Sequence, residues 1–308
     1  MRFWVGVTHN QWFSYLSERS FDEVNFWQPS PKPPFTNAPV GMPFLFKLKK
    51  PNHAIAGGGF FVAYSTLPTS LAWEVFGEKN GAGSLDELQS LLGPLSGGRS
   101  VTQEIGCTVL SNTFFLSRAK WFQDPPGWFG NIVRGKMYES NETSGAAIWN
   151  QVQWNFLAAE TQGMVSPSVV RDGPDRYGEP VLVRPRLGQS SFRVLVTDAY
   201  KRQCAMTGER TLLALEAAHI LPYANEGQHE VRNGLLLRAD FHRLFDVGLV
   251  GVTPDYRIKV SPRIREAWFN GQVYYRLNDQ PLAVLPDRPV DQPDRDLLDW
   301  HFTHRFQA

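Results

Sequence analysis

Residues 213–220 read Leu-Ala-Leu-Glu-Ala-Ala-His-Ile, residues 231–237 read Val-Arg-Asn-Gly-Leu-Leu-Leu, and residues 239–246 read Ala-Asp-Phe-His-Arg-Leu-Phe-Asp. The first stretch predicts a strand that ends at Pro222, and the second predicts another strand after a loop. The third stretch predicts a helix. His219, Asn233 and His242 fall on these elements at intervals of 14 and 9 residues.

This order of elements and these three side chains resemble the HNH, or ββα-metal, nuclease family. The resemblance covers about residues 191–270, including the helix predicted over 192–200 and the phrase Leu244-Phe245-Asp246. It implies an α+β fold with a C-terminal ββα-metal (HNH) nuclease domain. The implied activity is hydrolysis of phosphodiester bonds in DNA.

The resemblance also implies roles for the three residues. His219 would be the general base, Asn233 would fix the loop between the strands, and His242 would bind a divalent metal ion, Mg²⁺ or Mn²⁺. An imidazole with an ordinary pKa of about 6.5 can accept a proton from water at neutral pH. A divalent cation would neutralise charge on the phosphate and on the leaving oxygen.

The chain departs from the family pattern at Ala218, where many HNH nucleases carry an acidic metal ligand. Glu216 lies two residues earlier, on the same face of an extended strand, and could supply the carboxylate. Asp240 on the predicted helix is a second candidate. The other five histidines, His9, His53, His229, His301 and His304, fit no site spacing and are expected to be structural.

The composition bounds the other possibilities. Apolar residues make up 42% and charged residues 20% of the 308 residues, which is typical of a folded chain with about two domains. Two cysteines, Cys107 and Cys204, exclude a disulfide framework and a four-cysteine zinc site. Neither a signal peptide nor a membrane span is evident, so we expect a cytoplasmic protein.

The N-terminal part predicts a strongly curved, mainly β domain with a few helices. Strands are expected over 3–7, 43–48 and 60–64, with a bulge or close backbone approach at Gly57-Gly58-Gly59. Helices are expected over 10–16, 84–92 and 144–161, the second of them capped by Ser84 and Glu87. We therefore expect a first domain over 1–164, a Pro- and Gly-rich linker over 165–190 and a nuclease domain over 191–308.

Features of the first 160 residues are similar to the PUA-like barrels, especially the EVE type. An opening tryptophan strand, the phrase Val40-Gly-Met-Pro-Phe-Leu-Phe-Lys47 and the phrase Ile55-Ala-Gly-Gly-Gly-Phe-Phe61 carry this resemblance. It implies a curved β-barrel that reads a modified, flipped base in DNA. The candidate contacts to bases are Asn25, Trp27, Phe60, Trp73 and Trp121, although most aromatic residues of any such domain belong to its core.

Phosphate contacts are expected from arginines. Residues 171–202 hold seven basic and four acidic side chains, an excess of three, which fits either a phosphate-facing strip or a solvated linker. Arg193, in this strip, and Arg243, on the predicted helix, are the candidate contacts. The net charge of +1 does not by itself indicate a nucleic-acid partner.

The leading hypothesis is a modification-dependent restriction endonuclease that acts on double-stranded foreign DNA. The alternatives are an HNH nuclease that reads unmodified sequence, DNA structure or a phosphorothioate backbone, and a DNA-binding protein with a degenerate nuclease domain, as Ala218 could imply. A homodimer is a reasonable expectation because cutting both strands usually needs two active sites.

Overall fold

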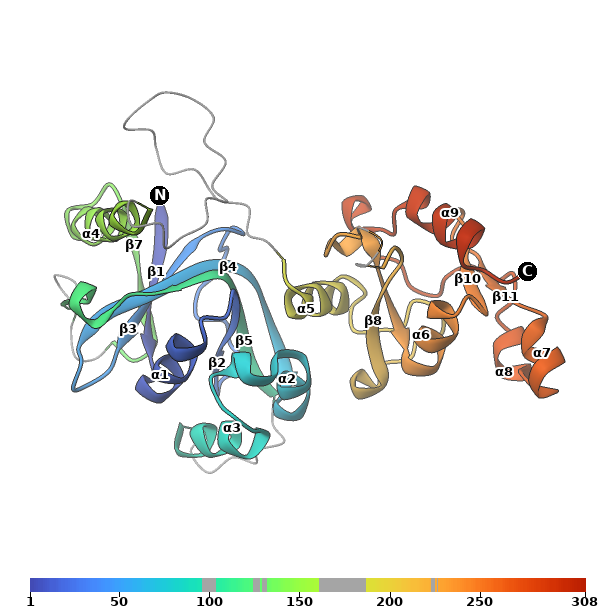
Figure 1. Cartoon of the computed structure of the whole chain (residues 1–308), viewed down its shortest axis with the longest axis horizontal. Coiled ribbons are helices and arrows are strands. Elements are labelled where there is room, and N and C mark those ends of the chain that lie inside the picture. The colour runs from blue at the N-terminus through green and yellow to red at the C-terminus, as the bar shows by residue number, and fades with distance from the viewer. Residues whose placement is uncertain (96–103, 124–127, 129–131, 161–186, 223–224, 226) are drawn as a thin grey trace, which may run out of the picture. The chain divides into compact units, whose positions relative to one another are not determined.

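The computed structural model describes residues 1–95, 104–123, 128, 132–160, 187–222, 225 and 227–308. Its chain divides into two compact units, Met1–Arg186 and Leu187–Ala308, each with strands and helices, as expected of an α+β protein (Figure 1). Most of the linker expected over 165–190 lies outside the described residues. Among the helices that are described, none has the length and apolar character needed to span a bilayer.

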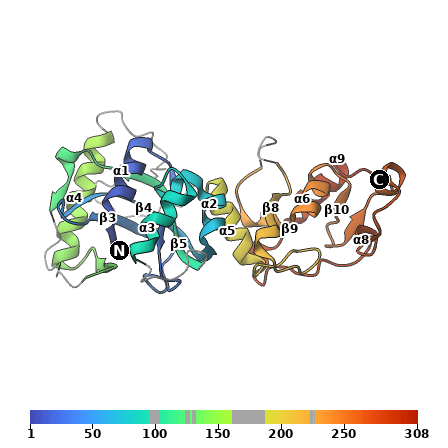
Figure 2. The same ribbon diagram turned by 90° about the horizontal axis from the view of Figure 1, so that it is seen from below.

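The N-terminal unit is built around one mixed sheet with helices beside it (Figures 1 and 2). Its strands are β1 (Arg2–Thr8), β2 (Glu23–Gln28), β3 (Pro43–Leu48), β4 (Ala54–Pro68), β5 (Glu104–Phe115), β6 (Phe122–Gln123) and β7 (Gly135–Glu139). Its helices are α1 (Asn10–Arg19), α2 (Thr69–Phe76), α3 (Leu85–Leu92) and α4 (Thr143–Glu160), with 3₁₀ turns η1 (Gly77–Asn80), η2 (Gly93–Leu95) and η3 (Arg118–Lys120).

The sheet is open within the described residues, so the closed barrel expected from the sequence is not found there. The strand order is β2-β5-β4-β3-β1-β7, and β6 pairs with β4 off this path. Only β1 and β3 are parallel; the other pairs are antiparallel. The end strands β2 and β7 do not pair with each other, which leaves two edges instead of a closed ring.

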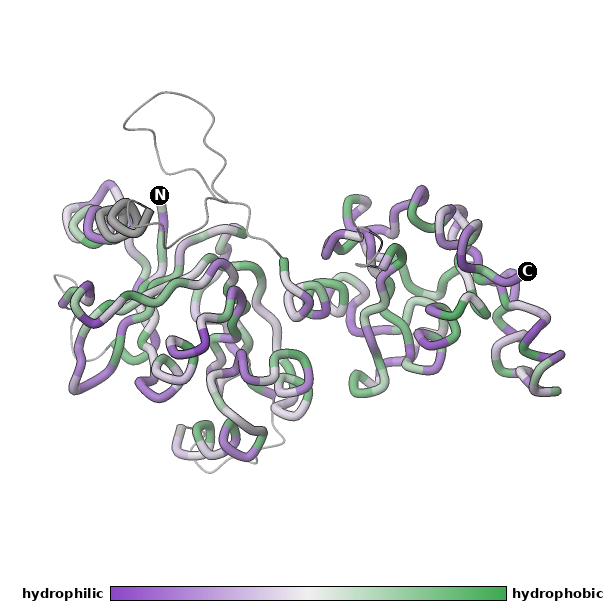
Figure 3. The backbone as a smooth tube through the Cα atoms, in the orientation of Figure 1, coloured by the Kyte–Doolittle hydropathy of each residue, from purple (hydrophilic) through white to green (hydrophobic). Residues whose placement is uncertain are grey.

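Close packing explains the glycines of β4. A Cβ atom on Gly58 would lie 2.6 Å from the carbonyl oxygen of Phe44, and the register with β5 shifts between Gly58 and Phe60. The close backbone approach expected from three successive glycines is therefore confirmed. Hydrophobic residues recur along the long strands β4 and β5 in Figure 3, and every side chain of β3 is buried.

Local sequence signals also set the start of helix α3. The Ser84 hydroxyl accepts a hydrogen bond from the backbone N–H of Glu87, as predicted. The Glu87 carboxylate accepts from the N–H of Gly83, one residue before the position expected in a capping box. The helix begins at Leu85, directly after its cap.

The C-terminal unit contains the element order strand, loop, strand, helix. Its strands are β8 (Leu215–His219), β9 (Gly234–Arg238), β10 (Val250–Val252) and β11 (Ile258–Val260). Its helices are α5 (Gln189–Ala199), α6 (Ala239–Asp246), α7 (Arg263–Trp268), α8 (Gln272–Tyr275) and α9 (Arg295–His304), with 3₁₀ turns η4 (Leu212–Ala214), η6 (Val231–Asn233) and η7 (Pro289–Asp291).

The first residues of both predicted strands form the 3₁₀ turns η4 and η6, so β8 and β9 begin later than predicted. They pair antiparallel, from Leu215 opposite Arg238 to His219 opposite Gly234. Helices α5 and α6 both contact this pair (Figures 1 and 2). The buried face of α6 consists of Phe241 and Phe245, which leaves His242 on a different face of the helix.

Candidate active site

His219 occupies the last position of β8, where its ring is held from two directions. The ring stacks on buried Phe192 of α5, with centroids 3.9 Å apart and planes 12° apart. Its Nε2 atom lies 3.0 Å from Nδ1 of His229. Burial, with smaller contributions from His229 and His242, lowers the pKa of His219 to about 4. The imidazole is therefore neutral at physiological pH and keeps a lone pair that can accept a proton.

Asn233 ties together the loop that connects β8 with β9. Its Oδ1 accepts from the N–H of Leu221 at 2.8 Å, and its Nδ2 donates to the carbonyls of Leu221 at 3.0 Å and Gln228 at 2.9 Å. The side chain is buried, so each of these hydrogen bonds would be costly to lose. Leu221 follows His219 by two residues, and Gln228 directly precedes His229. One amide thus fixes the chain beside both histidines.

His242 on α6 lies between two carboxylates. Its Nδ1 is 2.6 Å from Oε2 of Glu216 on β8, and its Nε2 is 3.4 Å from Oδ2 of Asp246, one helical turn along. The His242 side chain is 23% exposed and Glu216 is 40% exposed, so solvent reaches both groups. Burial and the nearby charge of Glu216 raise the pKa of Asp246, although His242 opposes this.

This group of donors suits a divalent cation with few protein ligands. An imidazole nitrogen and carboxylate oxygens are ligands for Zn²⁺, Mn²⁺ and Mg²⁺. Within the described residues, no group of three or more His, Cys, Asp or Glu side chains is arranged to hold a metal ion. His242 and Glu216 could therefore provide two ligands, leaving the other positions to water and phosphate oxygens, as is common for Mg²⁺.

The structure separates Glu216 from the other candidate carboxylate. Asp240 binds the guanidinium of Arg238 through two hydrogen bonds of 2.7 and 2.8 Å, and it accepts from the hydroxyl of Tyr274. Arg238 lowers the pKa of Asp240. Ala218, the position of the usual acid, is fully buried, where an unpaired carboxylate would be strongly destabilising.

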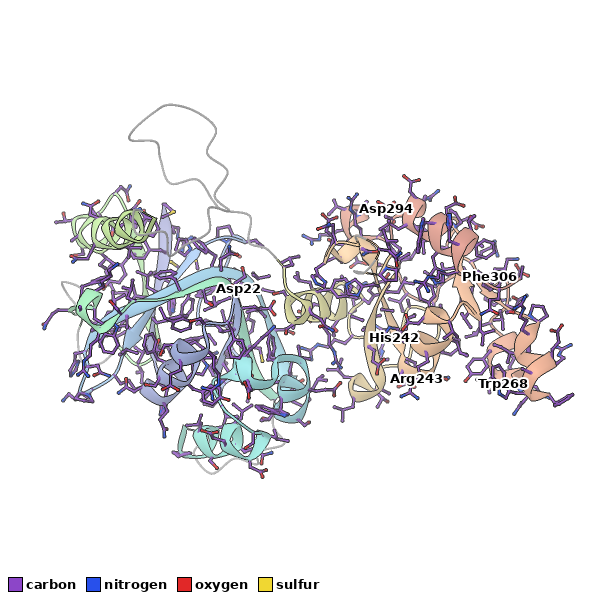
Figure 4. All side chains as sticks on the ribbon, viewed as in Figure 1. Asp22, His242, Arg243, Trp268, Asp294 and Phe306 are labelled. Atoms are coloured by element: carbon purple, nitrogen blue, oxygen red, sulfur yellow. The ribbon has the colours of Figure 1, made fainter. Side chains whose placement is uncertain are left out.

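The candidate phosphate contacts lie on two helices. Arg243 is exposed on α6, directly after His242 (Figure 4). Arg193 is half-buried on α5, directly after Phe192. Arg243 makes no ion pair with a described residue, whereas Arg193 does interact with another group.

Two candidate base readers of the N-terminal unit belong to its core, which corrects the sequence-based expectation. Asn25 is completely buried and donates from Nδ2 to Oδ1 of Asn80 at 2.9 Å. The indole N–H of Trp27 donates to the backbone carbonyl of the same Asn80 at 2.8 Å, and the ring is 8% exposed. Both side chains hold the 3₁₀ turn η1 against β2. Neither can contact a base without disrupting this packing.

The other three aromatic candidates keep part of their surface exposed. Phe60 on β4, Trp73 on α2 and Trp121 after η3 are all half-buried. Trp121 packs edge-on against Phe13 with its indole N–H bonded to the carbonyl of Leu116, and the Arg118 guanidinium lies 5.8 Å from its ring centre.

Sequence reasoning missed two residues of the nuclease-type site. His229 was expected to be structural, but it contacts His219 directly. No spacing signal indicates this, because the contact depends on how the loop folds back. Asp246 belongs to the phrase that carries the family resemblance but was assigned no role from the sequence, and it lies one helical turn after His242. The i, i+4 spacing on a predicted helix could have identified it.

Comparison with known proteins supports an HNH assignment for the C-terminal unit. Residues 204–253 match the family model described as HNH endonuclease. A search among curated protein sequences found no match. This match lies within the C-terminal unit and suggests a nuclease domain there.

Several solved structures show a weak likeness to the chain. One is a mutant of the ZmASCH protein from Zymomonas mobilis, with 8% identity, a TM-score of 0.33 and coverage of 48% of this chain and 94% of that chain. Another is a structure named modification-dependent TagI restriction endonuclease, with 15% identity, a TM-score of 0.28 and coverage of 91% of this chain and 74% of that chain. Both TM-scores are too low to establish a common fold.

Proposed function

We propose that this protein is a metal-dependent DNA endonuclease that cleaves DNA carrying a modified base. The main observation in favour of a nuclease is that two histidines on one ββα unit, His219 and His242, have chemically different surroundings. His219 contacts only an aromatic ring and another imidazole among its described partners, whereas His242 contacts two carboxylates. These surroundings suit a neutral proton acceptor and a metal ligand, respectively.

In this proposal, His219 accepts the proton of the attacking water, and Asn233 holds the loop so that the imidazole keeps its direction. His242 and Glu216 bind one divalent cation, which would neutralise charge on the phosphate and the leaving oxygen. Arg243 is free of described ion pairs and would contact a phosphate. Residues 204–253, which match the HNH family model, include all five of these side chains.

The recognition of a modified base is proposed for the N-terminal unit. In this proposal the HNH unit has little base preference of its own, so another part of the chain must select the substrate. Trp121 is the favoured candidate because its half-buried indole lies beside the exposed Arg118. An aromatic ring for stacking and a cation for phosphate are the two elements that bind an exposed base.

The test is incubation of the purified protein with modified and unmodified phage DNAs, with Mg²⁺, Mn²⁺ or EDTA. We expect metal-dependent cleavage of one or more modified DNAs and little cleavage of their unmodified counterparts. Equal cleavage of matched DNAs would retain the nuclease and reject modification dependence. Absence of cleavage from the whole panel, with binding retained, would favour a degenerate DNA-binding protein.

A further inference from the structure

The contact between His219 and His229 needs one proton in a defined place. Two neutral imidazole nitrogens 3.0 Å apart form a hydrogen bond only if one is protonated and the other is not. The proton lies either on Nε2 of His219 or on Nδ1 of His229. These two arrangements have opposite consequences for catalysis, because they leave the lone pair of His219 on different atoms.

A proton on Nε2 of His219 is the arrangement that would leave His219 able to act as a base. Nδ1 of His219 makes no hydrogen bond to a described residue and is not one of the buried polar atoms that lack a partner, so solvent reaches it. If Nε2 carries the proton, the lone pair on Nδ1 faces this accessible side. In the opposite tautomer, the only lone pair would be directed at His229 and could not accept a proton from water.

Stacking alone does not select this orientation. The Phe192 ring fixes the plane of the His219 ring, but a half-turn about the Cβ–Cγ bond would keep the stack and exchange Nδ1 with a carbon atom. Only a polar partner at one edge of the ring distinguishes the two orientations. Among the described residues that contact the His219 ring, His229 is that partner.

The loop fold shows how His229 is held there. Asn233 donates to the carbonyl of Gln228, the residue before His229, and binds both backbone groups of Leu221. Phe192 also packs against the His229 ring, with centroids 5.8 Å apart. The contact between the histidines is therefore supported by a buried amide and a buried aromatic ring.

We propose that His229 is a positioning residue: its Nδ1 accepts a hydrogen bond from Nε2–H of His219 and thereby directs the lone pair of Nδ1 of His219 at the attacking water. This inference rests on the proposed nuclease function. In the hydrolysis step, the O–H bond of water breaks and its proton moves to Nδ1 of His219. The water oxygen bonds to phosphorus, and the leaving oxygen keeps the electron pair of the broken P–O bond and takes a proton from solvent.

No proton needs to move to His229 in this step. When His219 becomes positively charged, its Nε2–H bond to His229 becomes charge-assisted and therefore stronger. This strengthening needs a neutral His229, because a charged His229 adds to the effect of burial, which lowers the pKa of His219 to about 4. A neutral His229 would stabilise the protonated base more than the neutral base, which is the requirement for a catalytic effect.

The first test measures the tautomer and does not depend on activity. Two-bond ¹H–¹⁵N spectra of the full chain, labelled at its seven histidines, report which ring nitrogen carries the proton. Assignment uses His219→Gln and His229→Asn. We expect His219 in the wild type to carry its proton on Nε2. A proton on Nδ1 of His219 would overturn the proposal, whether or not the protein cleaves DNA.

The second test measures cleavage of the best DNA from the phage panel in Mg²⁺ or Mn²⁺. His229→Ala should reduce the rate about 10–100-fold, a loss of the size found when the partner that orients a metal-ligating imidazole is removed. His229→Asn should recover much of this loss because its Oδ1 can accept the same hydrogen bond. The matched control is His304→Ala, since His304 is exposed and bonds its own helix at Trp300.

The outcomes separate the two proposals. If the wild type cleaves DNA and folded His229→Ala cleaves equally fast, the positioning role is wrong and the nuclease proposal stands. If His229→Asn is as slow as His229→Ala while both melt at the wild-type temperature, an acceptor at this position is not what matters and the proposal fails. If the wild type cleaves nothing, the nuclease proposal fails. The tautomer measurement still shows whether Nε2 of His219 donates its proton to His229.

Discussion

Nδ1 of His242 lies 2.6 Å from Oε2 of Glu216, a contact that joins helix α6 to strand β8. The family pattern expects an acid directly before the base histidine, but Ala218 at that position is buried in the core of the unit. Glu216 is on the same strand and reaches the imidazole from a partly exposed position. The contact therefore supports the proposal that Glu216 takes the place of the missing acid.

Glu216→Gln should weaken metal binding and slow cleavage, because the amide removes a negative charge beside His242. We expect a loss of about 10–100-fold in the affinity for Mn²⁺, measured by calorimetric titration. Asp240→Asn is the matched control: it removes a carboxylate from the same unit, but one that is bound to Arg238. Unchanged affinity in Glu216→Gln together with a loss in Asp240→Asn would reverse the assignment.

Asn233→Asp should slow cleavage and lower the melting temperature. The carboxylate can still accept from the N–H of Leu221, but it cannot donate to the carbonyls of Leu221 and Gln228. Each lost buried bond costs about 1–3 kcal/mol. The loop should then hold His229 less firmly against His219. Cleavage and melting temperature are measured on the same variant; full activity with a lowered melting temperature would limit Asn233 to a structural role.

Trp27→Ala should affect stability rather than DNA selection. The indole is almost completely buried and bonds the Asn80 carbonyl, so its removal should cost about 3–5 kcal/mol of unfolding free energy. Trp121→Ala, at a half-buried ring, should lower affinity for the preferred DNA instead, by about 1–3 kcal/mol. Denaturation curves and DNA titrations of both variants check this. A stable Trp27→Ala protein that has lost its preference for modified DNA would contradict the assignment.

Acid should destabilise the C-terminal unit through His301. Burial, opposed by a hydrogen bond to the Phe245 carbonyl and aided by Arg305, lowers the pKa of His301 from 6.5 to about 4. Between these two pH values the unfolded chain binds more protons than the folded one, so stability falls as pH falls through this window. His301→Gln keeps a donor near the carbonyl but does not titrate.

The melting temperature of His301→Gln should therefore fall less between pH 7 and pH 4.5 than that of the wild type. Part of the fall should remain, because the pKa of His219 is lowered in the same direction. An equal fall in both proteins would mean that His301 does not titrate in this window.

Much of the C-terminal unit could be predicted from sequence because local signals agree there. Helix α6 has the predicted bounds, and β8 and β9 differ from the predicted strands mainly in their 3₁₀ first turns. Short apolar runs indicate such elements well, but the ends of strands depend on pairing with the partner strand.

Contacts between residues far apart in the loop could not be predicted from the sequence. His229 contacts His219 because the loop folds back, and Asn233 holds that loop by its hydrogen bond to Gln228.

In the N-terminal unit, local elements could be predicted, but the burial of site candidates and the closure of the sheet could not. Strands β1 and β3 and helices α1 and α3 were indicated by local pattern, but β2 was interpreted as a reading segment. Its polar Asn25 was a candidate contact to a base, whereas Nδ2 of this side chain donates inside the core to Asn80, 55 residues later. Closure of the sheet into a barrel depends on whether the end strands β2 and β7 pair, and the local sequence pattern does not indicate this.

The central claim is that His219 and His242 carry out metal-dependent DNA cleavage. The most direct test compares the wild type with His219→Ala and His242→Ala on the DNA that the wild type cleaves best, in Mn²⁺ and in EDTA. We predict a rate lower by about 10²–10⁴-fold for His219→Ala with DNA binding unchanged, loss of cleavage for His242→Ala with partial recovery in excess Mn²⁺, and no cleavage in EDTA. Near wild-type cleavage by folded His219→Ala, or full cleavage in EDTA, would contradict the account.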